Sequence, residues 1–345
     1  MRIDLAVTRS KIDYSQYGQA LILEQLIATD TPSVLVDIGA NDGVCGSNSR
    51  ALLEKGWTGV LVEPLPRVFE KLKRNSSQFP EVTILQVAVS HERGLAPIFI
   101  GRDGDLGQMS SLSQDPLLLP GLSEQVIQVP TVPLADVLAA HRVPEDFGVL
   151  LIDTEGWDLN ILQGLEHTSK RPRIIVTEDF KGTNEAKYRL LAAQGYQYVG
   201  FWGSDSFWVN PRYLHPVQRF GVPAHRCPPG WPPTERDIQG GVAMLDQAAC
   251  FRNSVAGWAW NDADTAPSEV VYVRLQCSAT KETIAYEAWR TPRPDVAQAF
   301  NSDVLMFSGF RAFCDVAAGP YEVTVIQADG DYFVETRLGS ITIPL

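Results

Sequence analysis

Five runs of apolar, mostly β-branched residues dominate the first two-thirds of the chain. They occupy residues 34–38, 59–63, 82–89, 149–153 and 173–178. Continuous apolar runs without alternation predict strands that are buried on both faces, which is typical of a parallel sheet. Between them, residues 49–55, 66–75, 134–141, 158–165 and 184–194 carry apolar positions at helical spacing. The alternation predicts a doubly wound α/β fold with a mainly parallel, Rossmann-like sheet.

The hydrophobic pattern changes in three later segments. Residues 94–133 are rich in Gly, Pro and Ser, which predicts an insertion with short strands near the cleft. Residues 211–233 are rich in proline, and beyond residue 247 short alternating runs predict an antiparallel β-sandwich. We therefore expect an α/β domain over 1–212 with a helical lead-in at 1–30, a proline-rich linker over 213–245, and a sandwich over 246–345.

Composition narrows the classes of partner. The formal net charge is −12, so a nucleic-acid partner is not expected. No apolar run approaches the length of a membrane span, and the N-terminus has no apolar core behind a basic start. We expect a cytoplasmic protein without a transmembrane segment, although docking on a membrane complex stays open. The five widely spaced cysteines are predicted to be reduced structural thiols.

The loop after the first strand has the composition of a ligand-binding turn. The strand contains Asp37 and is followed by Gly39, Asn41 and Gly43, ahead of a predicted helix. Gly39 allows a sharp turn at the carboxyl edge, Gly43 permits close approach of a ligand, and a helix N-terminus offers free N–H groups. A dinucleotide fold prefers Gly-x-Gly-x-x-Gly, so the spacing Gly-x-x-x-Gly favours a cofactor without a pyrophosphate.

Glu63 closes the second strand, where its carboxylate would accept hydrogen bonds from both hydroxyls of a ribose. The alternative is that Gly39 and Gly43 only shape a tight turn and that Glu63 is a solvated strand end.

Several motifs in order along the chain carry a family resemblance. They are Tyr14-Ser-Gln-Tyr-Gly-Gln19, Val36-Asp-Ile-Gly-Ala-Asn-Asp-Gly43, Val62-Glu-Pro64, Ile152-Asp-Thr-Glu-Gly156 and Leu162-Gln-Gly164. Over residues 14 to about 209 the chain resembles the FkbM family of methyltransferases. The resemblance implies a cytosolic O-methyltransferase that uses S-adenosylmethionine to methylate a hydroxyl, often of a sugar or a polyketide-like natural product. We assign Asp37, Gly39, Asn41, Gly43, Glu63 and Ala88 to its cofactor site.

Carboxylates follow the fourth and fifth strands. Asp153 ends one, and Glu178 with Asp179 ends the other, so in a parallel sheet all three should meet at the same edge. Because like charges repel, a Mg²⁺ ion bound by these three would relieve the conflict and activate the acceptor hydroxyl. Without a metal, Asp153 or Glu155 would serve as the general base, or Glu155 would cap the next helix. A purely structural cluster is the remaining alternative.

Other residues near the predicted cleft have weaker signals. His91 follows the third strand and is assigned a catalytic role near the adenine or acceptor, although a lone histidine is more often a surface group. Ser110 and Ser111 in the insertion contact acceptor or cofactor, or are simply turn residues. Trp157, Trp202 and Trp208 offer flat faces for a sugar ring, but large aromatics near strands are more often part of the core.

Three C-terminal motifs resemble those of a small β-sandwich appended to enzymes of bacterial glycan assembly. They are Ala256-Gly-Trp-Ala-Trp260, Arg293-Pro-Asp-Val-Ala297 and Ser308-Gly-Phe-Arg311. The sandwich would bind glycan or dock on glycan-assembly enzymes, or would serve stability or homo-oligomer formation.

The sequence as a whole favours O-methylation of a sugar hydroxyl in a surface polysaccharide or glycoconjugate. The alternatives are a small-molecule hydroxyl acceptor such as a natural product, a non-catalytic glycan-binding scaffold, and a nicotinamide-dependent oxidoreductase.

Overall fold

The computed structural model describes ten stretches of the chain. They are residues 12–101, 110–112, 122–179, 185–213, 226–227, 241–245, 254–261, 270–299, 308–329 and 332–343. The chain divides into two compact units, one formed by Tyr14–Gly221 and the other by Val222–Leu345 with the segment that ends at Asp13. Most of the predicted linker and the start of the predicted N-terminal lead-in lie outside the described residues.

A seven-stranded sheet forms the centre of the first unit, with strand order β3-β2-β1-β7-β8-β10-β9. Its strands are β1 (Val34–Ile38), β2 (Thr58–Val62), β3 (Val82–Leu85), β7 (Asp146–Ile152), β8 (Arg171–Glu178), β9 (Gln197–Trp202) and β10 (Asp205–Val209). The first five strands named run parallel to one another, whereas β10 is antiparallel to both β8 and β9. The predicted mainly parallel α/β fold is confirmed, and β9 and β10 are strands that the sequence analysis missed.

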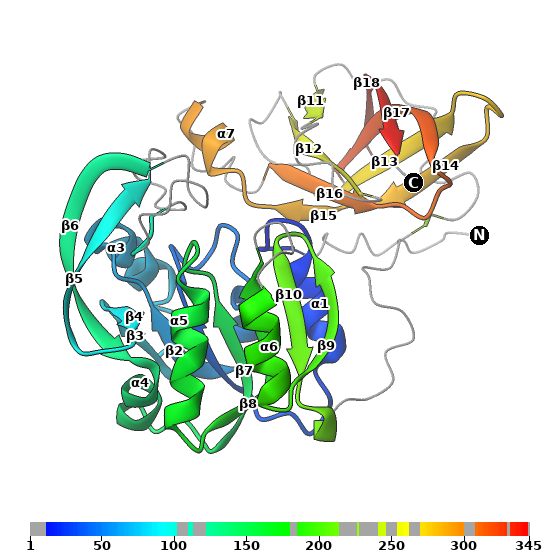
Figure 1. Cartoon of the computed structure of the whole chain (residues 1–345). Coiled ribbons are helices and arrows are strands. Elements are labelled where there is room, and N and C mark those ends of the chain that lie inside the picture. The colour runs from blue at the N-terminus through cyan, green and yellow to red at the C-terminus, as the bar shows by residue number, and fades with distance from the viewer. Residues whose placement is uncertain are drawn as a thin grey trace. The chain divides into compact units, whose positions relative to one another are not determined.

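Helices cover both faces of this sheet. They are α1 (Gln19–Leu26), α2 (Arg50–Glu54), α3 (Pro66–Asn75), α4 (Leu134–Ala140), α5 (Asp158–Gln163) and α6 (Glu185–Ala193), with 3-10 turns η2 (Gly164–His167) and η4 (Pro211–Tyr213). Residues of α4, α5 and α6 share one core cluster with the sheet, including Leu138, Ile161, Leu191 and Ile38. Figure 1 shows α5 and α6 in front of the sheet and α1 and α3 behind it. The sheet is therefore buried on both faces, as its continuous apolar runs predict.

The third predicted strand, over residues 82–89, is wrong as a single element. It is split into β3 and β4 (Ala88–Ser90), which belong to different sheets. The exposed Gln86 marks the break. The apolar run continues because Val89 packs in the core of the large sheet while Ala88 packs in a separate cluster with Leu65.

The insertion forms a small sheet with β4. Its strands are β5 (Gly94–Gly101) and β6 (Leu122–Pro133), and the strand order is β4-β6-β5. β6 runs parallel to β4 and antiparallel to β5. The prediction of strands within residues 94–133 is confirmed.

Two antiparallel four-stranded sheets make up the second unit, with orders β11-β12-β16-β15 and β14-β13-β17-β18. The elements are β11 (Gly241–Leu245), β12 (Ser254–Asn261), β13 (Val270–Cys277), β14 (Thr283–Glu287), β15 (Trp289–Thr291), α7 (Pro294–Ala299), β16 (Gly309–Phe313), β17 (Gly319–Asp329) and β18 (Tyr332–Ile343). Val255 and Phe310 of one sheet and Val273 and Val325 of the other lie in one buried cluster. This arrangement confirms the predicted β-sandwich.

Cysteine pairing and membrane crossing can be checked in the described residues. Cys45, Cys227, Cys277 and Cys314 are free thiols, whereas Cys250 lies outside the described part. None of the described helices combines the length and apolar character needed to cross a bilayer.

Candidate active site

The pocket of the first unit opens where the strand order of the large sheet reverses. The chain passes from β1 outward to β2, and the other half of the sheet begins at β7 directly beside β1. Ligands of open α/β sheets bind outside the carboxyl ends of the strands at such a point. The pocket there is lined by Gly39, Asn41, Glu63, Ala88 and Asp153 among others, and its empty space, counted to the open mouth, is about 1080 Å³.

Gly39 makes the turn that brings the β1 loop against β7. Its φ is +88°, and a Cβ there would stand 1.8 Å from the Asp153 carbonyl oxygen. The Gly39 N–H donates to the Val62 carbonyl at 2.9 Å, and the Asp153 N–H donates to the Ile38 carbonyl at 3.0 Å. Only glycine fits this position, because the loop is held between its two neighbouring strands.

Glu63 connects the β1 loop to the segment after β2. Its Oε2 accepts the Asn41 N–H at 3.1 Å, and its Oε1 accepts the Leu65 N–H at 2.8 Å. Each oxygen keeps a further lone pair for a ligand hydroxyl. Burial raises the pKa of Glu63 to about 7, although these two hydrogen bonds oppose the rise. Burial likewise raises the pKa of Asp37, which also lines the pocket, to about 6.

Gly43 is placed differently from our prediction, because it is not among the residues that line the pocket. Its φ is +72°, and a Cβ would meet the Leu72 Cδ1 at 2.7 Å, so this glycine lets the loop pack against α3. The predicted helix does not begin there either, since α2 starts at Arg50. Instead, the Asp42 Oδ1 accepts the N–H groups of Val44 and Cys45, each at 2.8 Å.

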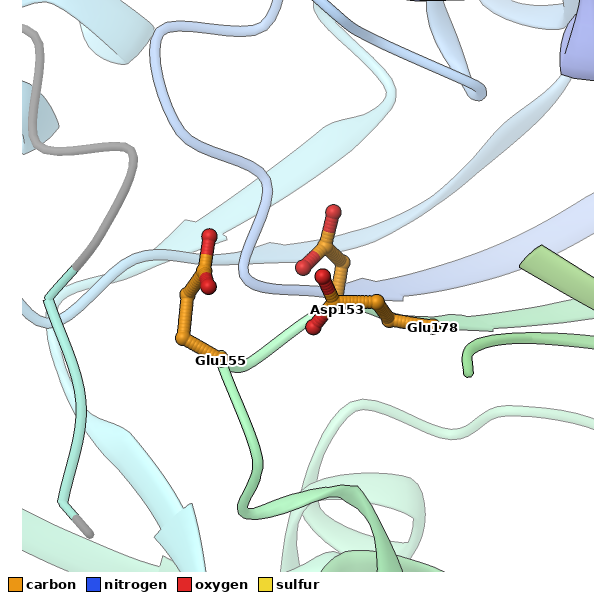
Figure 2. Close-up of side chains that lie close together, drawn as sticks. All are labelled: Asp153, Glu155 and Glu178. Carbon is orange, nitrogen blue, oxygen red and sulfur yellow. The ribbon is translucent and has the colours of Figure 1, made fainter. Parts of the chain in front are cut away.

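Three carboxylates converge at the carboxyl edge of β7 and β8. Ligand oxygens of Asp153, Glu155 and Glu178 lie within 4.8 Å of one another. Figure 2 shows the three side chains close together. Asp153 and Glu155 line the pocket, and the residue Asp153 is exposed to it. Although Asp153 is open to the pocket, the surrounding protein desolvates its carboxyl group. This desolvation first, and then the negative charge of Glu155, raise the pKa of Asp153 well above its ordinary value. Burial and the charge of Asp153 raise the pKa of Glu178 strongly.

Asp179 does not join this cluster as we predicted. It is fully buried, and its Oδ2 accepts a hydrogen bond from the Tyr188 hydroxyl at 2.6 Å. Successive residues along an extended strand point to opposite faces, so Glu178 and Asp179 cannot both reach the pocket. Glu155 takes the third place instead.

The sequence around the pocket is similar to that of a known protein family. Residues 37–198 match the sequence profile of the methyltransferase FkbM domain. This stretch is a methyltransferase FkbM domain. It contains Gly39, Glu63 and the three clustered carboxylates, and the match implies S-adenosylmethionine as methyl donor in general terms.

Several solved structures resemble the chain at low sequence identity. Precorrin-6y C5,15-methyltransferase from Geobacter metallireducens is 15% identical over 55% of this chain and 85% of that chain, with a TM-score of 0.30. A human methyltransferase 10 domain containing protein is 15% identical over 55% and 80%, with a TM-score of 0.33. WbdD is 11% identical over 94% and 74%, with a TM-score of 0.29. No curated protein matches the sequence significantly.

The remaining predicted residues of the first unit divide between the pocket and its surroundings. Trp157 and Ser110 line the pocket. His91 is exposed and not among the lining residues, and its ring centroid lies 6.3 Å from that of Trp157. Trp202 and Trp208 belong to the core, where their indole N–H groups donate to the Tyr17 carbonyl and the Ser206 hydroxyl.

Asp205 is a pocket residue of the first unit that the sequence analysis missed. It begins β10, and because β10 is antiparallel to β8, its first residue lies at the carboxyl edge. The Asn48 amide donates to its Oδ2 at 2.8 Å, and the Ser204 hydroxyl donates to its Oδ1 at 3.0 Å. Burial raises its pKa to about 6. Recognising β10 as an antiparallel strand would have located this residue.

Lys187 of α6 is a second residue that was missed. It is buried, and its ammonium donates to the backbone carbonyl of Glu178. Its charge lowers the pKa of Asp158 and Asp205, against the rise caused by burial. Its signal was a lysine within an otherwise apolar-patterned helix.

The described lining of the pocket is strongly acidic. It contains the carboxylates Asp37, Glu63, Asp153, Glu155 and Asp205, and among these described lining residues there is no Lys, Arg or His. Three buried polar atoms of the lining have no partner within the protein, namely Asn48 Oδ1, Thr154 Oγ1 and Trp157 Nε1. Buried polar atoms are nearly always satisfied, so these are available to a ligand or to water.

Proposed function

We propose that the protein is an S-adenosylmethionine-dependent O-methyltransferase that methylates a hydroxyl of a sugar in a surface polysaccharide or glycoconjugate. The observation that carries this proposal is that a single pocket presents both Glu63 and Asp153. Glu63 follows β2 and suits a ribose, whereas Asp153 follows β7 and suits an acceptor hydroxyl. The two carboxylates therefore lie on either side of the β1 loop. A methyl donor bound at Glu63 and an acceptor bound at Asp153 would meet at this loop.

The charge of the pocket fits this cofactor better than a nicotinamide dinucleotide. S-adenosylmethionine carries a sulfonium cation, which would favour the charged form of the lining carboxylates and be attracted by it. A dinucleotide would place two phosphates against the same carboxylates. It would also need a helix N-terminus directly after the glycine turn, whereas α2 begins only at Arg50. Both observations disfavour the oxidoreductase alternative.

Asp153 is our candidate for the general base. When bound, S-adenosylmethionine supplies an electrophilic methyl group, and the chain has to orient the acceptor hydroxyl and remove its proton. The sulfonium cation of the bound cofactor would favour the charged form of Asp153, and the raised pKa makes that carboxylate a stronger base than an ordinary aspartate. Orientation is the larger contribution, since holding reactants in line is worth roughly 7 to 11 kcal/mol of barrier.

A divalent cation is the alternative to a metal-free base. The structure would supply Asp153, Glu155 and Glu178 as its ligands, rather than the predicted set with Asp179. An Mg²⁺ ion there would lower the pKa of the acceptor hydroxyl. Without a cation, burial and mutual repulsion favour protons on the cluster, as the raised pKa values of Asp153 and Glu178 indicate.

A sugar acceptor is supported by the chemistry of the pocket lining. Trp157 offers an aromatic face, and Glu155 and Asp153 offer hydrogen-bond acceptors for vicinal hydroxyls. A small natural product with a hydroxyl is the competing acceptor. For the second unit we propose that the sandwich holds the polymer. A chain ending at Gly221 should then bind cofactor normally but methylate a polysaccharide less well than its short fragments.

The test begins with the cofactor and then turns to transfer. S-adenosylmethionine and S-adenosylhomocysteine should each stabilise the protein, by about 2.7 kcal/mol at one hundred times the dissociation constant, and NAD should not. Unmethylated oligosaccharides incubated with labelled cofactor should gain one methyl ether, located by mass spectrometry. Absence of any stabilisation at millimolar S-adenosylmethionine would reject the proposal. Transfer that stops on exhaustive chelation and returns with Mg²⁺ would instead establish the metal alternative.

A further inference from the structure

A short segment of the insertion is fixed to the wall of the pocket. The Ser111 N–H donates to the Phe99 carbonyl at 3.0 Å, and the Phe99 N–H donates to the Ser111 carbonyl at 2.8 Å, so the segment is bridged to β5. The neighbouring Leu112 packs against the cluster that contains Leu65 and Ala88. Ser111 is only 1% exposed. This part of the insertion is therefore anchored on two sides.

The side chain of Ser111 reaches across to the loop that follows β7. Its Oγ lies 2.7 Å from the Glu155 carbonyl oxygen and 3.4 Å from the Thr154 carbonyl oxygen. A hydroxyl has one proton to donate, so the shorter contact is the hydrogen bond. Ser111 is thus bonded to the backbone of the residue that carries one of the clustered carboxylates.

The backbone at Glu155 is in an unfavourable conformation that needs support. Its φ is +53°, and the φ of the following Gly156 is +91°. The left-handed region is disfavoured for a residue with a Cβ, and such conformations persist only where the surroundings fix them. The hydrogen bond from Ser111 fixes the carbonyl of this residue.

We propose that Ser111 is a positioning residue, which holds the loop of residues 153–156 so that Asp153 and Glu155 face the pocket. Through this hydrogen bond, the position of the acidic cluster depends on the segment of the insertion that contains Ser111. The catalytic consequence rests on the proposed function, whereas the restraint of the loop does not. Ser111 also lines the pocket, and in this proposal it acts through the loop.

The experiment compares Ser111→Ala with Ser77→Ala in the full chain. The Ser77 hydroxyl also donates to a backbone carbonyl, that of Arg74 at 2.8 Å, but it is exposed and outside the pocket. Amide hydrogen exchange is measured at residues 154–157, with β7 as the internal reference. Removing one hydrogen bond should speed exchange of the loop roughly two- to tenfold in Ser111→Ala. Ser77→Ala should leave loop exchange unchanged, and β7 should be unaffected in both variants.

Two further measurements separate positioning from simple stability. Affinity for S-adenosylhomocysteine should stay within about twofold of the wild type in Ser111→Ala, because Glu63 and the β1 loop are untouched. The rate of methyl transfer at saturating cofactor should fall on the order of tenfold, since misplaced reacting groups slow the step. If Ser111→Ala does not fold, Ser111→Cys replaces it, because a thiol is a weak donor of similar size.

Loop exchange equal to that of the wild type would overturn the proposal, whatever the activity. Faster exchange with an unchanged transfer rate would also overturn it, because the restraint would then have no catalytic role. A wild-type protein that transfers no methyl group would reject the proposed function, while the exchange comparison would still decide whether Ser111 restrains the loop.

Discussion

Replacing Glu63 with alanine tests the cofactor site at a residue whose contacts are known. In the free protein its two oxygens accept the N–H groups of Asn41 and Leu65, at 3.1 and 2.8 Å. Truncation leaves both donors without this acceptor and removes the proposed ribose contact. A hydrogen bond to a charged group is worth about 1.5 to 3 kcal/mol, and a neutral one about 1 kcal/mol. We expect affinity for S-adenosylhomocysteine to fall by about 1 to 3 kcal/mol, or about 5- to 150-fold in Kd.

Isothermal titration calorimetry measures this loss, with Glu70→Ala as control because Glu70 is an exposed carboxylate on α3. The pH dependence sharpens the assay. The pKa of Glu63 is about 7, so in the wild type affinity should rise as the pH passes through that value and the carboxylate becomes charged. Glu63→Ala should lose this rise. A Kd within twofold of the wild type, with the same pH dependence, would refute the ribose-binding role of Glu63.

Two other predictions concern stability. Gly39→Ala should destabilise the protein by more than about 3 kcal/mol in urea unfolding, because its Cβ would stand 1.8 Å from the Asp153 carbonyl oxygen. Gly56→Ala, at a similar φ of +85° but with nothing within 4 Å, should cost only about 1 kcal/mol, and equal losses would contradict the steric argument. The raised pKa values of Asp37 and Glu63, about 6 and about 7, contribute stability that is present below pH about 4 and lost as the pH rises through 6 and 7. Glu63→Gln should therefore gain up to about 3 kcal/mol relative to the wild type between pH 4 and pH 8, and a pH-independent difference would refute the assigned shift.

The fold was predictable where burial alone decides structure. The runs at residues 34–38 and 173–178 became parallel strands because both faces of the sheet are covered, and continuous apolar sequence reports that state directly. The run at 82–89 misled because two adjacent cores share it. β9 and β10 escaped because their residues include Gly200, Ser206 and several aromatics, so neither a continuous apolar run nor a clear alternation was visible.

The candidate site was predictable at the level of strand ends and not of side-chain direction. Topology brought Asp153 and Glu178 to one edge, as parallel strands require. Glu155 joins them in a backbone conformation with positive φ, which the pattern of residue types does not predict. The Asp179 side chain points into the core, because successive residues of an extended strand point to opposite faces. Gly43 shows the same limit, because a glycine that allows packing and one that admits a ligand look alike in sequence.

The most direct measurement of the central claim is single-turnover methyl transfer to an oligosaccharide by the wild type and by Asp153→Asn, with S-adenosylmethionine saturating and a chelator present. The asparagine keeps the shape of the side chain and removes the base. If Asp153 takes the proton of the acceptor hydroxyl without a metal, the wild type transfers the methyl group normally. The variant then binds cofactor equally well but is slower by about 10² to 10⁴. A variant that transfers at a rate within tenfold of the wild type would contradict the account.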